Sequence, residues 1–378
     1  MKRVVLAPDS FKGTMSSIRI CNIMEGVIKK HIPDIDVVKI PVADGGEGTV
    51  DCFIEALGGS KIQVEVLGPL FDKIDSFYGI LPDHTTAIIE MAAASGLPLI
   101  GDRKDPKIST TYGVGQLIKH AVIDNRCRKI IIGLGGSCTT DGGAGMVSAL
   151  GVKFYDKHNK EFIPVGGTLG EISRIDTSGL LKEIKDCTIL GMCDVDNPLF
   201  GENGAAYIYS PQKGANHESV LLLDKGLEHL SNQLIKQFNL DVSQKPGAGA
   251  AGGLGAGILA FLKGTLESGI ETVLDTVEFE ALLKDANMVF TGEGKIDGQS
   301  LRGKVVAGVA GRAKKQNIPV IAVVGDIGDD TDGIYDAGVS AIVSINRVAV
   351  PFEIAATRCE SDLAKTMDSI IRLTKLMI

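Results

Sequence analysis

The chain has 378 residues, with 39 lysines and arginines against 47 aspartates and glutamates, which gives a formal net charge of −8. This length suggests two domains, and the acidic balance argues against a nucleic-acid partner. The 47 glycines exceed the usual share of about 7%. Tryptophan is absent, and aromatic residues make up 5% of the chain. The composition therefore disfavours disorder and favours an α/β protein rich in glycine loops.

The cysteines and the apolar runs indicate a reducing compartment and no membrane partner. The seven cysteines are odd in number and include no CxxC pair, which excludes the simplest disulfide and zinc frameworks. Pro8 and Asp9 cut off the first apolar run, which is too short for a signal peptide. No stretch of about 18 uncharged apolar residues occurs. We therefore expect a cytoplasmic protein.

Apolar runs alternate with helical patterns at both ends of the chain. The predicted strands are 3–8, 37–41, 288–291, 319–325 and 341–345. The predicted helices are 16–30, 49–57, one that begins near 303, and 351–378. Alternation of this kind is typical of parallel strands joined by crossover helices.

The middle of the chain is less regular. It contains predicted strands at 64–67, 87–91, 129–134 and 188–193, a helix from 144 and an amphipathic helix at 218–238. The simplest organisation is one discontinuous parallel-sheet domain, residues 1–64 plus 286–378, with 65–285 inserted as a second, mixed α/β domain. The predicted fold class is therefore α/β with two domains.

A run of small residues, 247–257, allows two interpretations. It reads GAGAAGGLGAG and contains no serine, proline or charge. Glycine serves equally well in a flexible linker and in a segment that approaches another backbone closely. We leave both alternatives open.

In open α/β sheets, ligands bind beyond the carboxyl ends of the strands, so the loops there are the places to search. The first such loop is 9–14. Lys12 suits a phosphate, Ser10 can donate a hydrogen bond, and Gly13 lets the backbone approach a ligand. Asp9 suits a metal or a substrate hydroxyl. The alternative is that Asp9 and Ser10 only cap the following helix.

The second loop, 44–49, pairs carboxylates with glycines. Asp44 and Glu47 lie three residues apart, and carboxylates beside open backbone suit Mg²⁺, which prefers oxygen ligands. The alternative is again a capping arrangement, with Glu47 in the first helical turn.

The third loop, 133–145, reads GLGGSCTTDGGAG and precedes a predicted helix. Its backbone amides, with the hydroxyls of Ser137, Thr139 and Thr140, form a suitable anion site around Gly135 and Gly136. Asp141 orients the loop or binds metal. The pattern is not GxGxxG, so a dinucleotide fingerprint is set aside. A purely structural tight turn is the alternative.

The fourth loop, 292–304, offers Glu293, Lys295, Asp297 and Lys304 as polar candidates. Residues 298–304 fit GxxxxGK, but Val305 stands where the Walker motif needs a serine or threonine, so that motif is rejected.

Further polar residues belong to the middle of the chain. Asp194 follows a predicted strand in 193–198, where Asn-Pro alternatively signals a turn. Lys213 lies beside a glycine, and 110–115 either caps a helix or offers hydroxyls to a ligand. Glu90 falls inside an apolar strand, so it needs a partner. The six histidines are scattered, which disfavours zinc and histidine-based hydrolysis. The remaining residue types are typical of Mg²⁺-assisted phosphoryl transfer.

Nine stretches of the chain form a recognisable series: APDSFKGTMSS (7–17), PVADGGEGT (41–49), IEMAAASGL (89–97), TTYGVG (110–115), IIGLGGSCTTDGGAGM (131–146), CDVDNPLFG (193–201), PQKGA (211–215), PGAGAAGGLG (246–255) and TGEGKIDGQSLRGK (291–304). In these stretches the sequence resembles bacterial glycerate kinases of the first type, and they follow the family's order over nearly the whole chain. Two departures are small: 138–140 reads Cys-Thr-Thr where Ala-Thr-Asn is common, and Lys295 replaces a common arginine.

The resemblance implies ATP-dependent phosphorylation of D-glycerate, with 2-phosphoglycerate favoured over 3-phosphoglycerate. It also implies a flavodoxin-like domain, a second domain of mixed fold, and an active-site cleft between them. D-Glycerate and ATP are then the partners, and ATP with Mg²⁺ the cofactors. Oligomeric state does not follow from the sequence.

Within that activity, Asp194 is our predicted base, with Asp9 and Asp44 as rivals. Lys12, with Lys213 or Lys304, would neutralise charge on the transferred phosphoryl group. Asp44 and Glu47 are the predicted metal ligands, and the 133–145 loop would hold the carboxylate of glycerate. The predicted substrate- and nucleotide-binding residues are Ser10, Gly13, Gly135, Gly136, Ser137, Asp141, Lys213, Glu293, Asp297 and Lys304; the predicted catalytic residues are Asp194, Lys12 and Asp9.

Two other functions remain open from the residues alone. A non-catalytic sensor of sugar acids or sugar phosphates would need the loops but neither base nor metal, and the carboxylates weigh against it. An isomerase or lyase acting on a phosphorylated sugar acid would need phosphate loops but no ATP.

Overall fold

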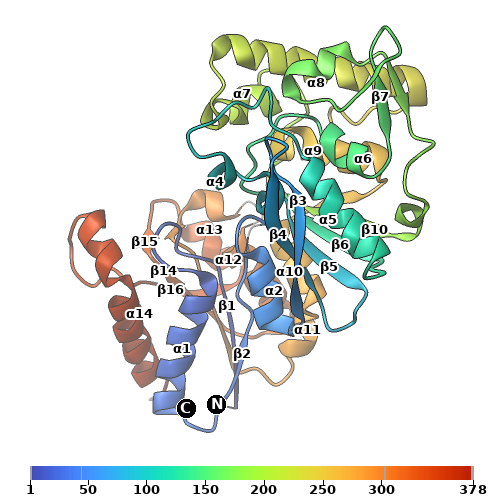
Figure 1. Ribbon diagram of the computed structural model, residues 1–378. Helices are drawn as coiled ribbons and strands as arrows, with labels where there is room; N and C mark the ends of the chain where they lie inside the picture. The colour runs from blue at the N-terminus through green and yellow to red at the C-terminus, as the bar shows by residue number, and fades with distance from the viewer. Residues whose placement is uncertain (1, 44, 302–303, 376–378) are drawn as a thin grey trace. The chain divides into compact units, whose positions relative to one another are not determined.

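The computed structural model describes residues 2–43, 45–301 and 304–375, which form two compact units (Figure 1). The first unit consists of Met1–Ala43, Asp51–Leu57 and Ile270–Ile378. The second consists of Asp44–Val50 and Gly58–Gly269. Both units are therefore discontinuous in sequence, and the short segment 44–50 belongs to the second.

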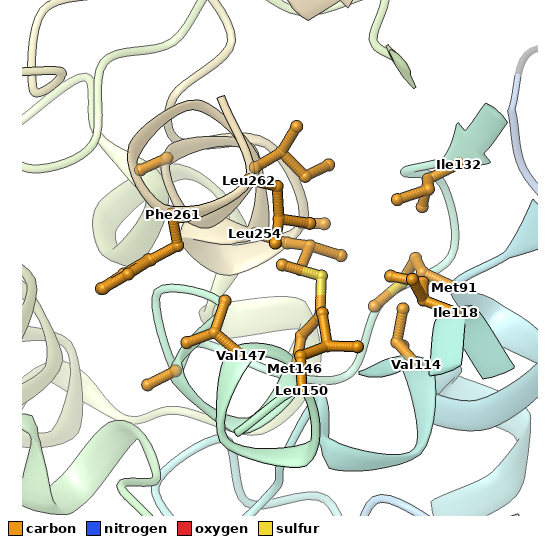
Figure 2. Packing of buried hydrophobic residues seen from close by; sticks show 14 of the residues in the cluster. Met91, Val114, Ile118, Ile132, Met146, Val147, Leu150, Leu254, Phe261 and Leu262 are labelled. Atoms are coloured by element: carbon orange, nitrogen blue, oxygen red, sulfur yellow. The ribbon is translucent and has the colours of Figure 1, made fainter. Parts of the chain in front are cut away.

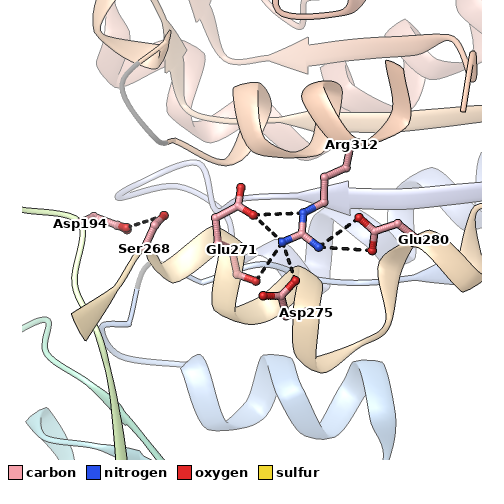
Figure 3. A network of polar contacts seen from close by, with 6 residues as sticks. All are labelled: Asp194, Ser268, Glu271, Asp275, Glu280 and Arg312. Carbon is pink, nitrogen blue, oxygen red and sulfur yellow. Dashed lines mark hydrogen bonds and ion pairs between the residues drawn. The ribbon is translucent and has the colours of Figure 1, made fainter. Parts of the chain in front are cut away.

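These boundaries differ from the expected ones after residues 64 and 285. A boundary after 64 would cut β3 (Ser60–Leu67), which pairs along its whole length with the antiparallel β4 (Lys73–Ile80). Residues 270–285 pack with the first unit because Arg312 binds Glu271, Asp275 and Glu280 there (Figure 3).

The first unit is built on a five-stranded parallel sheet in the order β16-β14-β12-β1-β2. Its strands are β1 (Arg3–Pro8), β2 (Asp36–Lys39), β12 (Met288–Gly292), β14 (Val320–Val324) and β16 (Val339–Ser344). Counted along the chain within this unit, the order is 2-1-3-4-5, which is that of flavodoxin-like folds. The predicted parallel sheet is confirmed, and all five strands fall where the apolar runs predict them.

Helices cover both faces of this sheet. The helices α1 (Ser17–His31) and α14 (Phe352–Lys375) lie side by side on one face (Figure 1). Ile20, Met24 and Ile28, four residues apart, form the buried stripe of α1. The helix α12 (Val305–Lys315) packs on β12 and β14, and the other helices assigned wholly or mostly to this unit are α2 (Thr49–Leu57), α10 (Gly269–Thr276), α11 (Phe279–Leu282) and α13 (Asp332–Asp336). The start near 303 predicted for α12 and the predicted end of α14 at 378 lie outside the described residues.

The second unit contains a six-stranded mixed sheet in the order β11-β10-β6-β5-β4-β3. The strands β5 (Thr86–Glu90), β6 (Lys129–Gly133), β10 (Thr188–Met192) and β11 (Thr265–Glu267) run parallel, while β3 and β4 complete the sheet antiparallel. This unit has the expected mixed α/β character.

A continuous apolar core joins that sheet to the helices of the second unit. Figure 2 shows Val114, Ile118, Met146, Val147 and Leu254 packed together, and all are fully buried. The helices are α3 (Ala92–Ser95), α4 (Leu97–Ile100), α5 (Tyr112–Ile123), α6 (Ala144–Ala149), α7 (Ala205–Tyr209), α8 (His217–Phe238) and α9 (Ala250–Phe261). A small antiparallel sheet and short 3₁₀ helices complete it: β7 (Lys153–Tyr155), β8 (Glu161–Phe162), β9 (Arg174–Asp176), η1 (Gly166–Glu171), η2 (Lys182–Asp186) and η3 (Pro211–Lys213).

The glycine-rich run 247–257 is not a linker. Most of it forms α9, whose first turns are interrupted by left-handed backbone at Ala251, Gly252 and Gly253. A Cβ on Gly252 would lie 2.0 Å from the carbonyl oxygen of Thr139, and one on Gly253 would lie 2.8 Å from Cα of Gly142. Of the two interpretations, the segment that approaches another backbone closely is therefore the correct one, and it packs against the 133–145 loop.

Among the described residues, no helix combines the length and the apolar character that crossing a membrane requires.

Candidate functional site

Two of the predicted loops meet in the first unit, at the point where its strand order reverses. β1 lies between β2 and β12, and Pro8 pairs in register with Gly292. In flavodoxin-like sheets, ligands bind at this reversal. The segments that follow β1 and β12 leave the sheet here. The amide of Asp9 donates to the Gly292 carbonyl at 2.8 Å, and a Cβ on Gly294 would lie 3.4 Å from the Lys12 nitrogen.

The first residues of the loop after β1 do not cap the helix α1. Ser16 caps α1 by accepting a hydrogen bond from the amide of Arg19, so neither Asp9 nor Ser10 has that role. Asp9 Oδ1 instead accepts from the amide of Ser10 at 2.6 Å. Gly13 has φ of 77°, and a Cβ added to it would have no heavy atom within 4 Å. The loop therefore turns sharply through glycine and presents an exposed Lys12 side chain.

Glu293 is the buried acid of this loop pair. Its side chain is 6% exposed, and Oε1 has no hydrogen-bond partner among the residues that the structure describes. Burial raises the pKa of its carboxyl group, while a hydrogen bond with Ser300 and the charge of Lys304 oppose that rise. The hydroxyl of Ser300 also accepts a hydrogen bond from the backbone amide of Asp297. The first unit thus places Glu293 near two lysines, Lys304 and Lys12.

Replacing Glu293 by glutamine should stabilise the ligand-free protein near neutral pH. The pKa of Glu293 in the folded state lies above its ordinary value of 4.5, so the folded state binds more protons than the unfolded state between these two values. Folding stability therefore falls as pH rises through that window, and glutamine avoids this cost. Thermal unfolding of both proteins against pH measures the effect.

The gain from Glu293→Gln should vanish below pH 4.5, where both states hold the proton. The matched control is Glu353→Gln, an exposed glutamate at the start of α14. A glutamine variant at 293 that unfolds at a lower temperature than wild type at pH 7 would contradict this account of the buried charge.

The second unit brings two glycine loops together at the carboxyl edge of its sheet. The amide of Gly135 donates to the Gly45 carbonyl at 3.0 Å, and a Cβ on Gly133 would lie 2.3 Å from that same oxygen. A Cβ on Gly135 would lie 2.6 Å from Cα of Gly46. Side chains are therefore excluded where the two backbones cross, which explains the glycines in both loops.

Asp141 organises the 133–145 loop. It is fully buried, and its two oxygens accept hydrogen bonds from the amide and hydroxyl of Thr111 and from the amides of Gly143 and Gly145. Burial raises the pKa of this carboxyl group, and these donors oppose the rise. The hydroxyl of Thr111 also accepts from the Met146 amide. The polar groups of 110–111 thus support the loop, and Asp141 acts as its internal anchor.

Lys213 lies beneath the same loop. Its side chain is 1% exposed, and Nζ donates to Ser137 Oγ at 2.8 Å and to the Thr139 carbonyl at 2.6 Å. Burial lowers the pKa of its ammonium group to about 8. The structure therefore joins two predicted residues, Lys213 and Ser137, that lie 76 residues apart in the chain.

Asp194 lies just beyond β10 and is exposed. Its Oδ1 accepts from the amide of Gly269 at 2.7 Å and from the hydroxyl of Ser268 at 3.2 Å (Figure 3). No turn is assigned at Asn197-Pro198 themselves; the Asn197 side chain instead donates to the Asn203 carbonyl. The carboxylate of Asp194 is thus oriented by the residues that follow β11.

The two predicted metal ligands differ in what the structure describes. Asp44 lies outside the described residues, and Glu47 is exposed on the loop before α2. No group of three or more histidine, cysteine, aspartate and glutamate side chains suited to a metal occurs within residues 2–43, 45–301 and 304–375. Mg²⁺ commonly takes only one or two protein carboxylates, with water and phosphate oxygens completing its shell.

Glu90 has the partner that its burial requires. It ends β5, is 3% exposed, and its Oε1 accepts from the amide of Val50 at 2.7 Å. The only signal in the sequence is a carboxylate inside an apolar run, and it does not identify the partner 40 residues away. Thr139, one of the hydroxyl residues that the 133–145 loop offers, is also buried, and its hydroxyl has no partner among the described residues.

The candidate residues divide between the two units. The first holds Asp9, Ser10, Lys12, Gly13, Glu293, Asp297 and Lys304; the second holds Glu47, Gly135, Gly136, Ser137, Asp141, Asp194 and Lys213.

Comparison with known proteins identifies the family behind this arrangement. A model of the glycerate kinase family matches residues 4–375. The chain belongs to the glycerate kinase family. The resemblance stated from the motifs is thereby confirmed.

Relatives within the glycerate kinase family match over nearly their whole length. A glycerate kinase of Bacillus cereus (strain ATCC 10987 / NRS 248) is 44% identical over 375 residues, covering 99% of this chain and 98% of the relative. A glycerate 2-kinase of Escherichia coli (strain K12) is 45% identical over 344 residues, covering 91% and 90%. A solved structure from Salmonella typhimurium LT2, presented as a glycerate kinase 2, is 40% identical with a TM-score of 0.89, covering 99% of this chain and 98% of that one.

Proposed function

We propose that this chain phosphorylates the 2-hydroxyl of D-glycerate with ATP, assisted by Mg²⁺. The observation that supports this most is the nearly full-length match to relatives named glycerate kinases at 44% and 45% identity. The name of the Escherichia coli relative, glycerate 2-kinase, favours the 2-position. The residue types at the ends of the strands fit, because phosphoryl transfer needs positioning and charge neutralisation more than covalent chemistry.

The first unit would bind nucleotide. Its exposed lysines, Lys12 and Lys304, suit phosphate oxygens, and Gly13 leaves room for them at the turn after β1. Lys12 would neutralise charge that develops on the transferred phosphoryl group. Glu293 and Asp297 would fix the surrounding loop and contact nucleotide, with Ser10 adding a donor.

The second unit would bind the acceptor and remove its proton. Asp194 would accept the proton of the attacking hydroxyl, with its carboxylate held by Gly269 and Ser268. The loop from Gly135 to Ser137 would contact the acceptor. Asp9 and Asp44 remain the rival bases.

The residue types fit Mg²⁺. Asp44 and Glu47 are hard oxygen donors, and the Glu47 side chain is exposed and able to reach a ligand. These two residues would hold the ion, which would neutralise charge on the phosphate oxygens of the nucleotide.

Purified protein should release ADP when D-glycerate is added with Mg²⁺ and ATP. Glycerol, which lacks the carboxylate, and 3-hydroxypropionate, which lacks the 2-hydroxyl, should release almost none. A coupled ADP assay measures all three. Turnover of 3-hydroxypropionate comparable to that of D-glycerate would contradict transfer to the 2-hydroxyl, and binding of D-glycerate without ADP release would favour a sensor.

A further inference from the structure

A buried lysine that forms no ion pair with the residues the structure describes lies under the 133–145 loop of the second unit. Lys213 Nζ donates to two neutral oxygens, Ser137 Oγ and the Thr139 carbonyl. The charged or titratable groups that face it are Asp141 and Cys138. Both oxygens of Asp141 are engaged by Thr111 and the loop amides, and no ion pair of Lys213 occurs among the described residues.

A buried charge of this kind destabilises the folded protein unless an anion or another polar ligand pairs with it. Burying an ammonium group without a paired anion destabilises a folded protein, and the group responds by losing proton affinity. Burial lowers the pKa of Lys213 to about 8, although the nearby Cys138 and Asp141 oppose this fall. Independently, the buried hydroxyl of Thr139 has no partner in the described part of the chain. Both observations indicate a polar ligand that belongs here.

Ser137 is the side chain through which Lys213 can act. A serine hydroxyl has one hydrogen to donate, and since Nζ donates to its oxygen, that hydrogen points away from the lysine. Ser137 retains 7% of its exposed surface, whereas Lys213 retains 1%. Lys213 therefore cannot readily touch a ligand, but it can orient and polarise the hydroxyl of Ser137.

We propose that Ser137 donates its hydroxyl hydrogen to the carboxylate of the hydroxy-acid acceptor, and that Lys213 is the positioning residue that supplies the positive charge behind it. The inference rests on the proposed function and specifies where the acid group of its substrate binds. One buried charge matches one carboxylate, whereas the exposed lysines that suit the several charges of a nucleotide, Lys12 and Lys304, lie in the first unit.

The test is calorimetric binding of D-glycerate, and separately of ATP, to wild-type protein and Lys213→Met. Methionine keeps most of the length of the side chain and removes the ammonium group with its charge. D-Glycerate affinity should fall about tenfold to a hundredfold, the range for losing a charge-assisted hydrogen bond, while ATP affinity stays within about twofold of wild type. The matched control is Lys104→Met, an exposed lysine that should bind both ligands as wild type does.

The pH dependence separates this role from a merely structural one. In wild type, D-glycerate affinity should fall as pH rises past about 8, because the ammonium group then loses its proton. Lys213→Met should show no such fall. Lys213→Arg keeps its charge at this pH and should bind without the fall if it folds, which circular dichroism checks.

The proposal is overturned if Lys213→Met, folded by circular dichroism, binds D-glycerate within about twofold of wild type. It is also overturned if Lys213→Met loses affinity for ATP and keeps its affinity for D-glycerate, since Lys213 would then contribute to binding a nucleotide phosphate. Wild-type protein that binds D-glycerate with this pH dependence but never transfers phosphate would contradict the proposed function alone.

Discussion

Replacing Asp194 by asparagine is expected to lower kcat for D-glycerate by about a hundredfold to ten-thousandfold, the usual contribution of general acid–base catalysis. Asparagine keeps an oxygen that can accept from the Gly269 amide and the Ser268 hydroxyl, so the local geometry should survive. It cannot take a proton from the attacking hydroxyl. Steady-state kinetics with unchanged thermal unfolding would isolate the chemical role.

Two further variants at this strand end make the result for Asp194 interpretable. Asp196→Asn changes an exposed neighbouring carboxylate and should leave kcat close to wild type. Asp194→Ala removes both the proton acceptor and the hydrogen bonds to the start of α10, so it should also lose about 1 kcal/mol of stability. Near-normal turnover in Asp194→Asn would rule out Asp194 as the base and leave Asp9 and Asp44 as candidates.

The largest expected effect on stability is that of Gly252→Ala, with a loss of at least about 4 kcal/mol in the free energy of unfolding. The new Cβ would lie 2.0 Å from the Thr139 carbonyl oxygen, a backbone atom that cannot move without displacing the 133–145 loop. Gly252 also has φ of 69°, which L-residues rarely adopt. Urea denaturation followed by circular dichroism measures the loss.

Gly201→Ala is the matched control, since Gly201 has φ of 94° but no heavy atom within 4 Å of a new Cβ. It should cost only the backbone strain, about 1–2 kcal/mol. If Gly252→Ala costs no more than Gly201→Ala, α9 does not pack against the loop, and residues 247–257 act as a linker.

The elements best predicted from sequence are those with local signals. β1 occurs at the predicted residues 3–8, and α2 at 49–57, because an apolar run and an amphipathic period are visible in one short window. The sequence did not predict β4. Its residues KIDSFYGI mix charged, polar and aromatic side chains without a clear alternation, and which of them are buried depends on the neighbouring strands. The left-handed turn in α9 likewise depends on contact with a loop over 100 residues earlier.

The loops of the candidate site were predictable, but their partners were not. Glycines and polar residues after apolar runs pointed to 9–14, 133–145 and 292–304. The loops after β1 and β12 lie close together because these two strands pair, and the strands are far apart in the sequence. Whether Asp141 binds ligand or anchors its loop likewise depended on a residue outside the loop, Thr111.

The measurement that tests the central claim most directly is proton-coupled ³¹P NMR of the product formed from D-glycerate, ATP and Mg²⁺. The account predicts ADP together with a new phosphate-ester resonance split into a doublet by the single hydrogen on C2. A triplet, from the two hydrogens on C3, would place the phosphate on the 3-hydroxyl and contradict the proposed regiochemistry. Consumption of ATP without any phosphate ester, or no consumption at all, would contradict the assignment of this chain as a D-glycerate kinase.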